Sequence, residues 1–452
     1  MSGLGFGMKD LGMKDIIKAQ PRHVAIKRAI LFIIPSVVIT VISIILFSQL
    51  RGFTIRQLNV FSITIISAVV LSLIGMAAVQ FLIYRIIDDR EYFKDGSTSR
   101  AIKLGMVYSL LFSLIISAVL NPYFTHVLGF SRTDYLYFPL LLLMYSAIWI
   151  YSSAYWASEK YLYPALIFSL SYVAILGLTL FANKMDPTYT LLGYSLGTAV
   201  LFISLLITST ILFRKPETHH KFTDDLSKTF NLVSHNGAAI LFSIFYVIAL
   251  FLDKIIVWVH QGMASGQGLL LTGTYGTGAF LGLTPLLSIA IIVYFSRRAN
   301  ALNDERYAGT FTDIKKRASA YQAVYWSSFR AMIAIALGLF ALTLIATVYF
   351  IPDSEILSVL ITTSIGSIFF SVITFNSVVL PIFGKTSIST VAMLVVIIFE
   401  ILSIRFVSFD VWYASIGFLL GSFTGFLISI TSVIRVFYRF EYNLFRYLLH
   451  SN

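Results

Sequence analysis

A single carboxyl group lies deep within a long apolar run of this chain. Glu400 occupies the middle of MLVVIIFEILSIRF, and in a helix counted from Thr386 it would lie about 21 Å along the axis. Carboxyls placed this deep usually face a cavity or a partner, and they often carry a proton because burial disfavours the charged form. Glu400 is therefore a candidate for ion coupling or cargo contact. The alternatives are a structural ion pair and a neutral buried acid.

A second charged pair lies near the far end of another apolar run. Asp253 and Lys254 follow LVSHNGAAILFSIFYVIALFL, and counting from Leu232 puts Asp253 about 31 Å along a helix axis, near the opposite interface. The pair is either interfacial or functional, and we keep both residues as coupling candidates. Lys254 is also a possible partner for Glu400.

Aromatic and hydroxyl side chains line one face of a third apolar segment, FPLLLLMYSAIWIYSSAYWASEKY. Tyr145, Trp149, Ser152 and Trp156 recur at helical spacing, so they share one face. Lipid offers no partner for their polar atoms, and this face should therefore look into a helix bundle. Flat rings with a donor at the rim suit a path along which sugars slide. Helix packing with an interfacial aromatic belt is the alternative. The other cavity-lining candidates, each of which could instead join helices, are Gln80, Asn376 and Arg330.

The composition indicates which elements must hold these residues. Of 452 residues 58% are apolar and 12% are charged, far from the roughly 25% charged residues of a soluble domain. The chain is thus predicted to be an all-α polytopic membrane protein. It has no cysteine, which excludes catalysis through sulfur, and no nucleotide-binding GxxxxGK[ST] motif. We expect no catalytic residue, cofactor, metal or nucleic-acid partner.

Hydropathy and loop charge together predict twelve spans. Their ranges are 29–48, 58–84, 104–121, 135–156, 162–182, 189–213, 232–258, 270–294, 328–350, 356–380, 386–404 and 411–434. With the N-terminus cytoplasmic, 26 of the 33 Lys and Arg residues fall on the cytoplasmic side and 5 on the outer side. This ratio follows the positive-inside rule and predicts that both termini are cytoplasmic.

The connections repeat with a period of six helices, because long charged links follow spans two and eight while tight turns follow spans four and ten. We therefore expect two six-helix bundles of like topology. The predicted regions are a basic amphipathic segment (1–28), the N-terminal bundle (29–213), a cytoplasmic linker (214–231), the C-terminal bundle (232–434) and a cytoplasmic tail (435–452).

Two short motifs and the aromatic-basic connection after the predicted eighth span carry a resemblance to a known family. GLGFGMKDL at residues 3–11 is similar to a GIGF-x-L-(R/K) opening, and FLDKIIVW at residues 251–258 to a D-K-W-(I/F)-x-W segment. The chain thereby resembles the PelG exopolysaccharide exporters of the multidrug/oligosaccharidyl-lipid/polysaccharide (MOP) flippase superfamily, which includes the MATE transporters. It departs from the family pattern at Gly7, at Ile255 and at Arg297 with Arg298.

The resemblance implies two bundles in a V around a central, alternately open cavity, working beside a cytoplasmic glycosyltransferase and other membrane subunits of an export system. The expected function is export of a polysaccharide, such as a Pel-like biofilm exopolysaccharide, across the cytoplasmic (inner) membrane. Alternatives are a flippase for a lipid-linked oligosaccharide and a cation-coupled drug exporter with Glu400 or Asp253 as its proton site. A membrane glycosyltransferase is disfavoured because the outer links are short.

Overall fold

The computed structural model describes residues 55–88, 97–213, 236–264, 274–292, 311–351, 353–407 and 409–440, together with a few single positions between them. Every element within these residues is a helix. The predicted N-terminal segment and cytoplasmic linker lie outside the described residues, as do most of the predicted first span and most of the predicted tail.

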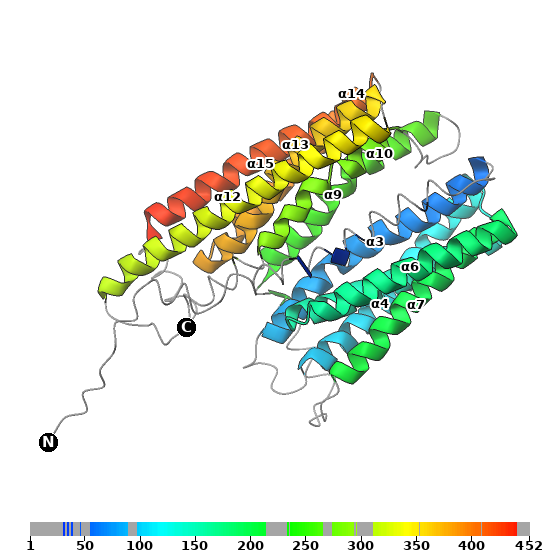
Figure 1. The fold of residues 1–452 in the computed structure, drawn as a ribbon, viewed down its shortest axis with the longest axis horizontal. Helices are drawn as coiled ribbons and strands as arrows, with labels where there is room; N and C mark the ends of the chain where they lie inside the picture. The colour runs from blue at the N-terminus through cyan, green and yellow to red at the C-terminus, as the bar shows by residue number, and fades with distance from the viewer. Residues whose placement is uncertain are drawn as a thin grey trace.

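Two groups of helices lie side by side (Figure 1). The N-terminal group consists of α3 (Ile55–Asp88), α4 (Ser97–Pro122), α5 (Arg132–Ala157), α6 (Leu162–Met185) and α7 (Thr190–Leu212), with the short helices η1 (Tyr123–Val127) and η2 (Pro187–Tyr189) at turns. The C-terminal group consists of α9 (Gly237–Ala264), α10 (Thr274–Leu281), η3 (Thr284–Ala290), α12 (Phe311–Phe350), α13 (Ser354–Val379), η5 (Leu380–Phe383), α14 (Thr386–Val407) and α15 (Trp412–Tyr438).

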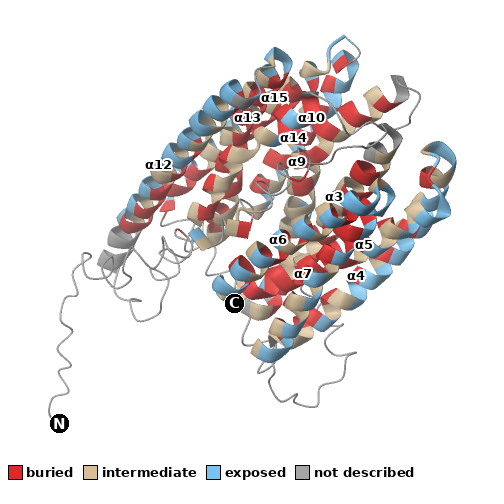
Figure 2. Cartoon of the chain, turned by 45° about the vertical axis from the view of Figure 1, so that its right-hand side comes forward, coloured by how far each residue is buried: buried red, intermediate tan, exposed pale blue. Residues whose placement is uncertain are grey.

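Within the described residues, ten helical segments are long and apolar enough to cross a membrane. They correspond to ten of the twelve predicted spans, and the chain is a multi-pass membrane protein. Their outward faces expose large apolar side chains, whereas buried residues face the inside of each group (Figure 2). This pattern is typical of helices whose outer surface meets lipid, where exposed Leu, Ile and Val carry no penalty.

The predicted eighth span, 270–294, is not one continuous helix. The α-helix α10 ends at Leu281, and the 3₁₀ helix η3 begins at Thr284. Pro285 stands at the start of η3; its ring supplies no N–H and restricts the residue before it, so it favours a break in the α-helix at this point. A hydropathy window registers both pieces as one apolar run and misses the break.

The helix that contains the predicted ninth span begins before the span does. The helix α12 begins at Phe311, ahead of the predicted span start at 328, so the basic residues 315–317 of the predicted connection are helical. At 1.5 Å per residue its 40 residues span about 60 Å, which exceeds the roughly 30 Å of a hydrocarbon core. A helix can continue into water beyond the membrane, and charged residues alone do not end it.

Glycines on α15 bring this helix close to α14. A Cβ atom added to Gly417 would lie 2.6 Å from the Cβ of Ser403, and one added to Gly421 would lie 2.8 Å from the Cα of Val396. Small residues at four-residue spacing allow two backbones to approach this closely. The α14–α15 contact fixes the position of α14, the helix that carries Glu400.

Candidate functional site

The helix α9 contacts both groups of helices. Val247 and Phe251 pack with Val70 and Ala77 of α3 in one buried apolar cluster. Further along α9, Trp258 joins the apolar core of the N-terminal group. On another side of the helix, Ala249 packs into the core of the C-terminal group. A change in the position of α9 therefore alters contacts in both groups.

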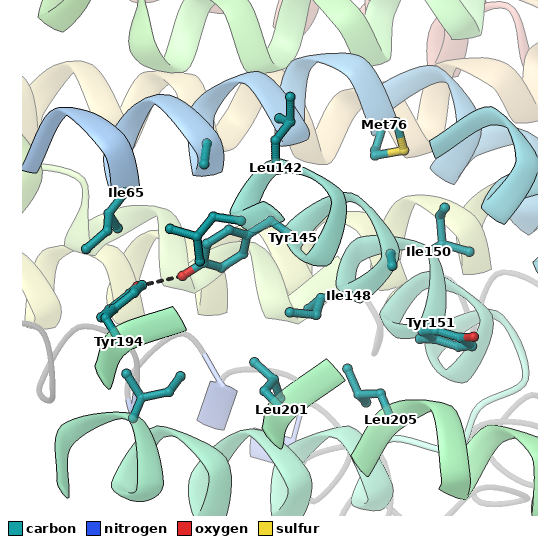
Figure 3. Packing of buried hydrophobic residues seen from close by; sticks show 14 of the residues in the cluster. Ile65, Met76, Leu142, Tyr145, Ile148, Ile150, Tyr151, Tyr194, Leu201 and Leu205 are labelled. Carbon is teal, nitrogen blue, oxygen red and sulfur yellow. Dashed lines mark hydrogen bonds between the residues drawn. The ribbon is translucent and has the colours of Figure 1, made fainter. Parts of the chain in front are cut away.

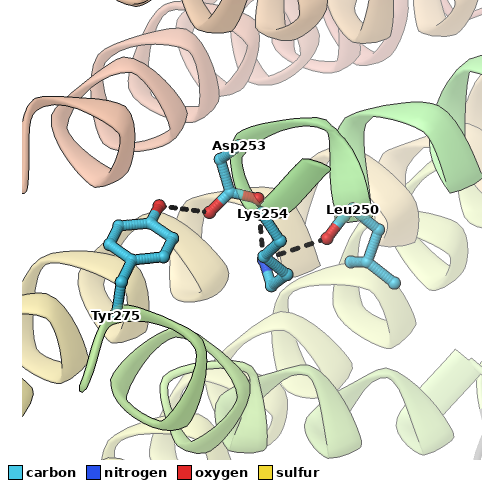
Figure 4. A network of polar contacts seen from close by, with 4 residues as sticks. All are labelled: Leu250, Asp253, Lys254 and Tyr275. Carbon is cyan, nitrogen blue, oxygen red and sulfur yellow. Dashed lines mark hydrogen bonds and ion pairs between the residues drawn. The ribbon is translucent and has the colours of Figure 1, made fainter. Parts of the chain in front are cut away.

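Asp253 and Lys254 form an ion pair inside the protein. The Lys254 Nζ atom lies 2.8 Å from Asp253 Oδ1, and neither side chain has any exposed surface. The same Nζ donates a 3.1 Å hydrogen bond to the carbonyl oxygen of Leu250, one turn earlier (Figure 4). Desolvation of two charges is offset only when both are well paired. The burial on all sides favours the functional or structural interpretation of this pair over an interfacial one.

Tyr275 of α10 completes the pairing of Asp253. Its hydroxyl donates a 2.8 Å hydrogen bond to Asp253 Oδ2 (Figure 4). The ring is buried in an apolar cluster with Val257 and Val359. Two glycines place α10 against α13: a Cβ atom on Gly278 would lie 2.7 Å from the Ile356 carbonyl oxygen, and one on Gly282 would lie 2.6 Å from the Thr363 Cβ. The short helix can therefore dock closely enough for the phenol to reach α9.

An aromatic ring provides a second contact for the Lys254 ammonium. Its Nζ lies 5.7 Å from the centroid of the Phe418 ring on α15. A cation at this distance from a ring is attracted by the π electrons, and the attraction grows when both are desolvated. Lys254 thus contacts α15 as well as its own helix.

Glu400 is fully buried, and within the described part of the chain neither of its carboxyl oxygens has a hydrogen-bond partner. Val396, one turn before Glu400 on α14, packs in the same buried cluster as Ala249, one turn before Asp253 on α9, so Glu400 lies at the level of the ion pair. A buried carboxylate without a donor is costly. We call Asp253, Lys254, Tyr275 and Glu400 the charge cluster. It can hold, release or relocate a proton within the C-terminal group.

The structure pairs two of the three predicted coupling candidates, Asp253 and Lys254, with each other, and within the described residues no hydrogen bond joins Glu400, the other possible partner of Lys254, to either of them. Lys254 bonds to Asp253, its neighbour in the sequence. Sequence analysis missed Tyr275 and Phe418. The signal for Tyr275 was a phenol in an apolar segment, which needs a partner for its hydroxyl.

The aromatic face of α5 lies in the core of the N-terminal group (Figure 3). The hydroxyls of Tyr145 and Tyr194 are 2.5 Å apart, Trp149 Nε1 donates to Ser72 Oγ at 3.1 Å, and Ser152 Oγ donates to the Ile148 carbonyl at 2.7 Å. Trp156 is half-buried. The first three polar groups are therefore engaged within the group in this conformation.

The remaining predicted residues are separate from the charge cluster. Asn376 accepts a 2.8 Å hydrogen bond from Tyr325 and donates one of 3.1 Å to Ser429, so it joins α12, α13 and α15. Arg330 is exposed on α12, where its Nε donates to the Trp326 carbonyl at 3.2 Å. Gln80 is half-buried on α3.

Solved structures with the same fold are transporters. The chain superposes on an outward-facing MATE family multidrug transporter of the MOP superfamily, with a TM-score of 0.66 and 13% identity, over 94% of this chain and 98% of that one. A MOP superfamily transporter from Pyrococcus furiosus gives 0.63 and 14%, over 91% and 96%. A Vibrio cholerae MATE transporter gives 0.61 and 12%, over 91% and 96%. The fold is that of MOP superfamily transporters.

Within this class the sequence identifies the family. The family model PelG, described as an exopolysaccharide exporter (EPS-E), matches residues 1–445. The chain belongs to the PelG family, whose fold and function are those of transporters rather than enzymes. A comparison with curated proteins gave no match.

Proposed function

We propose that this protein exports an exopolysaccharide of the Pel type from the cytoplasmic to the outer face of the cytoplasmic membrane. The two groups of helices would rock against each other, opening a central cavity alternately to either side. The family match supports the cargo class. The observation that carries the mechanism is the placement of a buried ion pair on α9, the helix that packs against both groups.

The charge cluster is the proposed coupling site, since charged groups within a membrane mark ion or substrate pathways. Glu400 is its titrating member because both oxygens are buried without a hydrogen-bond partner in the described part of the chain. The polymer would come from a cytoplasmic glycosyltransferase within the same export system. The half-buried Trp149, Trp156 and Gln80 are the proposed cargo contacts on the N-terminal side.

A flippase for lipid-linked oligosaccharide is the main alternative. Such cargo carries a pyrophosphate, for which a cavity would offer free cations. Among the described span residues, Lys254 is already neutralised by Asp253, and Arg330 lies on an exposed face of α12. This arrangement favours a neutral or weakly charged polymer.

The test is a deletion strain in which polysaccharide is measured in the medium and inside the cells. Wild-type protein should restore secretion, and Glu400→Gln should fail to restore it while reaching the membrane at the wild-type level. Glu355→Gln, which changes an exposed carboxyl at the start of α13, is the matched control and should restore secretion. Unchanged secretion after deletion would exclude the proposal. Accumulation of lipid-extractable oligosaccharide instead of polymer would support the flippase alternative.

A further inference from the structure

The charge cluster holds two carboxyls but only one ammonium. Lys254 bonds to Asp253, and Glu400 is left without a hydrogen-bond partner in the described part of the chain. Glu400 and Asp253 each follow, by one turn, a residue of the buried cluster that joins α14 to α9, namely Val396 and Ala249. One ammonium and two carboxylates would leave a net negative charge in a fully buried site, which is costly. The cluster is neutral when its two carboxyls share one proton.

The present arrangement is one of two equivalent ways to reach neutrality. In the conformation described here, Lys254 neutralises Asp253, and the proton belongs on Glu400. In the other, Lys254 would neutralise Glu400, and Asp253 would carry the proton. Both states have the same total charge and one ion pair.

We propose that Lys254 is a switch residue that exchanges Asp253 for Glu400 as its partner, and that this exchange accompanies the rocking of the two groups of helices. The contact from Nζ to the Asp253 carboxylate breaks and one to the Glu400 carboxylate forms. Glu400 releases its proton, Asp253 binds one, and Lys254 stays charged throughout. The transport role of the exchange rests on the proposed function, but the exchange itself does not require a known cargo.

The neighbours of the cluster suit both states. The Tyr275 hydroxyl, which donates to Asp253 in this conformation, can rotate to accept a hydrogen bond once Asp253 is protonated, because a phenol is both donor and acceptor. The Phe418 ring is neutral and lies 5.7 Å from the ammonium. It can attract the cation without binding it as tightly as a carboxylate would, so it does not fix Lys254 to either partner.

The exchange can act on both groups through α9. In this conformation the ammonium is bonded within α9, to Leu250 and Asp253. A bond to Glu400 would instead tie α9 to α14. Phe251 and Trp258, within one turn of the ion pair, pack against the N-terminal group. A shift of α9 toward α14 therefore changes its contact with α3.

The test uses the full-length protein in lipid nanodiscs. Because the chain contains no cysteine, spin labels can be placed only where cysteines are introduced. Met185→Cys and Phe409→Cys lie at the ends of α6 and α14, where the native side chains are 68% and 80% exposed. The distance between the two labels reports how far apart the two groups are at that end.

The two carboxyl variants should move the distance distribution in opposite directions. Glu400→Gln removes the alternative partner and should hold the conformation described here, whereas Asp253→Asn should populate the other one. We expect the ratio of the two conformers to differ by about tenfold between these variants. In a Lys254→Gln background the two substitutions should no longer have opposite effects, and Glu355→Gln should leave the distribution unchanged. A shift in the same direction, or no shift, would overturn the proposal.

Two further measurements keep the proposal testable if an amide variant fails to fold. Glu400→Asp and Asp253→Glu retain both carboxyls, so each should still populate both conformers. If either variant showed only one conformer, as expected for the amide variants, the proposed exchange would be contradicted. Infrared spectroscopy of the wild-type protein should show a protonated carboxyl at neutral pH, and its absence would also overturn it. Unchanged polymer secretion after deletion of the gene would exclude the proposed cargo while leaving these results intact.

Discussion

The hydroxyl of Tyr275 on α10 donates a 2.8 Å hydrogen bond to the carboxylate of Asp253 on α9, and both side chains are fully buried. The bond joins the interrupted segment that includes α10 to the helix that contacts both groups. It also satisfies the carboxylate oxygen that Lys254 does not reach. The Tyr275 hydroxyl therefore offsets part of the cost of burying the charge of Asp253.

Tyr275→Phe should reduce the free energy of unfolding by about 1.5–3 kcal/mol, the range for a hydrogen bond to a charged group. Thermal unfolding in detergent measures the effect. Tyr413→Phe is the control, because Tyr413 is 37% exposed at the start of α15 and the ring is retained. Equal melting temperatures for the two variants would show that the bond to Asp253 contributes nothing.

Replacing one member of the Asp253–Lys254 ion pair should reduce the free energy of unfolding more than replacing both. Lys254→Met leaves the Asp253 carboxylate buried without its cation and should cost about 3–5 kcal/mol of stability. Adding Asp253→Asn should restore a substantial part of this loss, because no uncompensated charge remains. Unfolding of the single and double variants forms a double-mutant cycle. A double variant less stable than either single variant would contradict the expectation.

The contact between α6 and α7 should not tolerate a larger residue. A Cβ atom on Gly197 would lie 2.5 Å from the Cα of Ile175, and no flexible side chain can relieve this backbone clash. Gly197→Val should separate the two helices and lower the yield of folded protein. Gly177→Ala is the control, since an added Cβ there has no atom within 4 Å, and its stability should be unchanged or raised. Normal yield of Gly197→Val would refute the prediction.

Glu159, in the turn between α5 and α6, has a backbone conformation that residues with a Cβ atom rarely adopt. Glu159 has a φ of 58°, while the Lys160 and Glu159 N–H groups donate to the carbonyls of Tyr155 and Trp156. This is the pattern of a Schellman helix end, where glycine is preferred. Glu159→Gly should stabilise the protein by about 1 kcal/mol. Glu159→Ala removes the same side chain but keeps the strain, so an equal gain there would assign the effect to the side chain.

Glu400, Asp253 and Lys254 could be found from the sequence because a charge within an apolar run is conspicuous. Their pairing could not be found in this way. Adjacent residues on a helix point in different directions, so the sequence alone does not say whether Lys254 pairs with Asp253 or with Glu400. The long lysine side chain bends back along its own helix to Leu250 and Asp253, a choice that depends on where α10 and α15 pack.

The spans follow from hydropathy because length and apolar content alone decide whether a segment can cross a membrane. The interruption after Leu281 was signalled by Pro285, but an averaged hydropathy window does not register a single residue. The aromatic face of α5 was found by its period, whereas its hydrogen bonds to Tyr194 and Ser72 depend on α7 and α3. Periodicity identifies a face and does not say which helix covers it.

The double contact of α9 also limits how sequences of this kind can diverge. Phe251 must fit Ala77 of α3, while Asp253, two residues later, must fit Tyr275 of α10. A replacement in α3 that tilts α9 would disturb the ion pair, and so would be retained only with compensating changes in α10 or α14. The two halves therefore cannot evolve independently, and positions in α3 should covary across relatives with positions in α10 and α14 that they never touch.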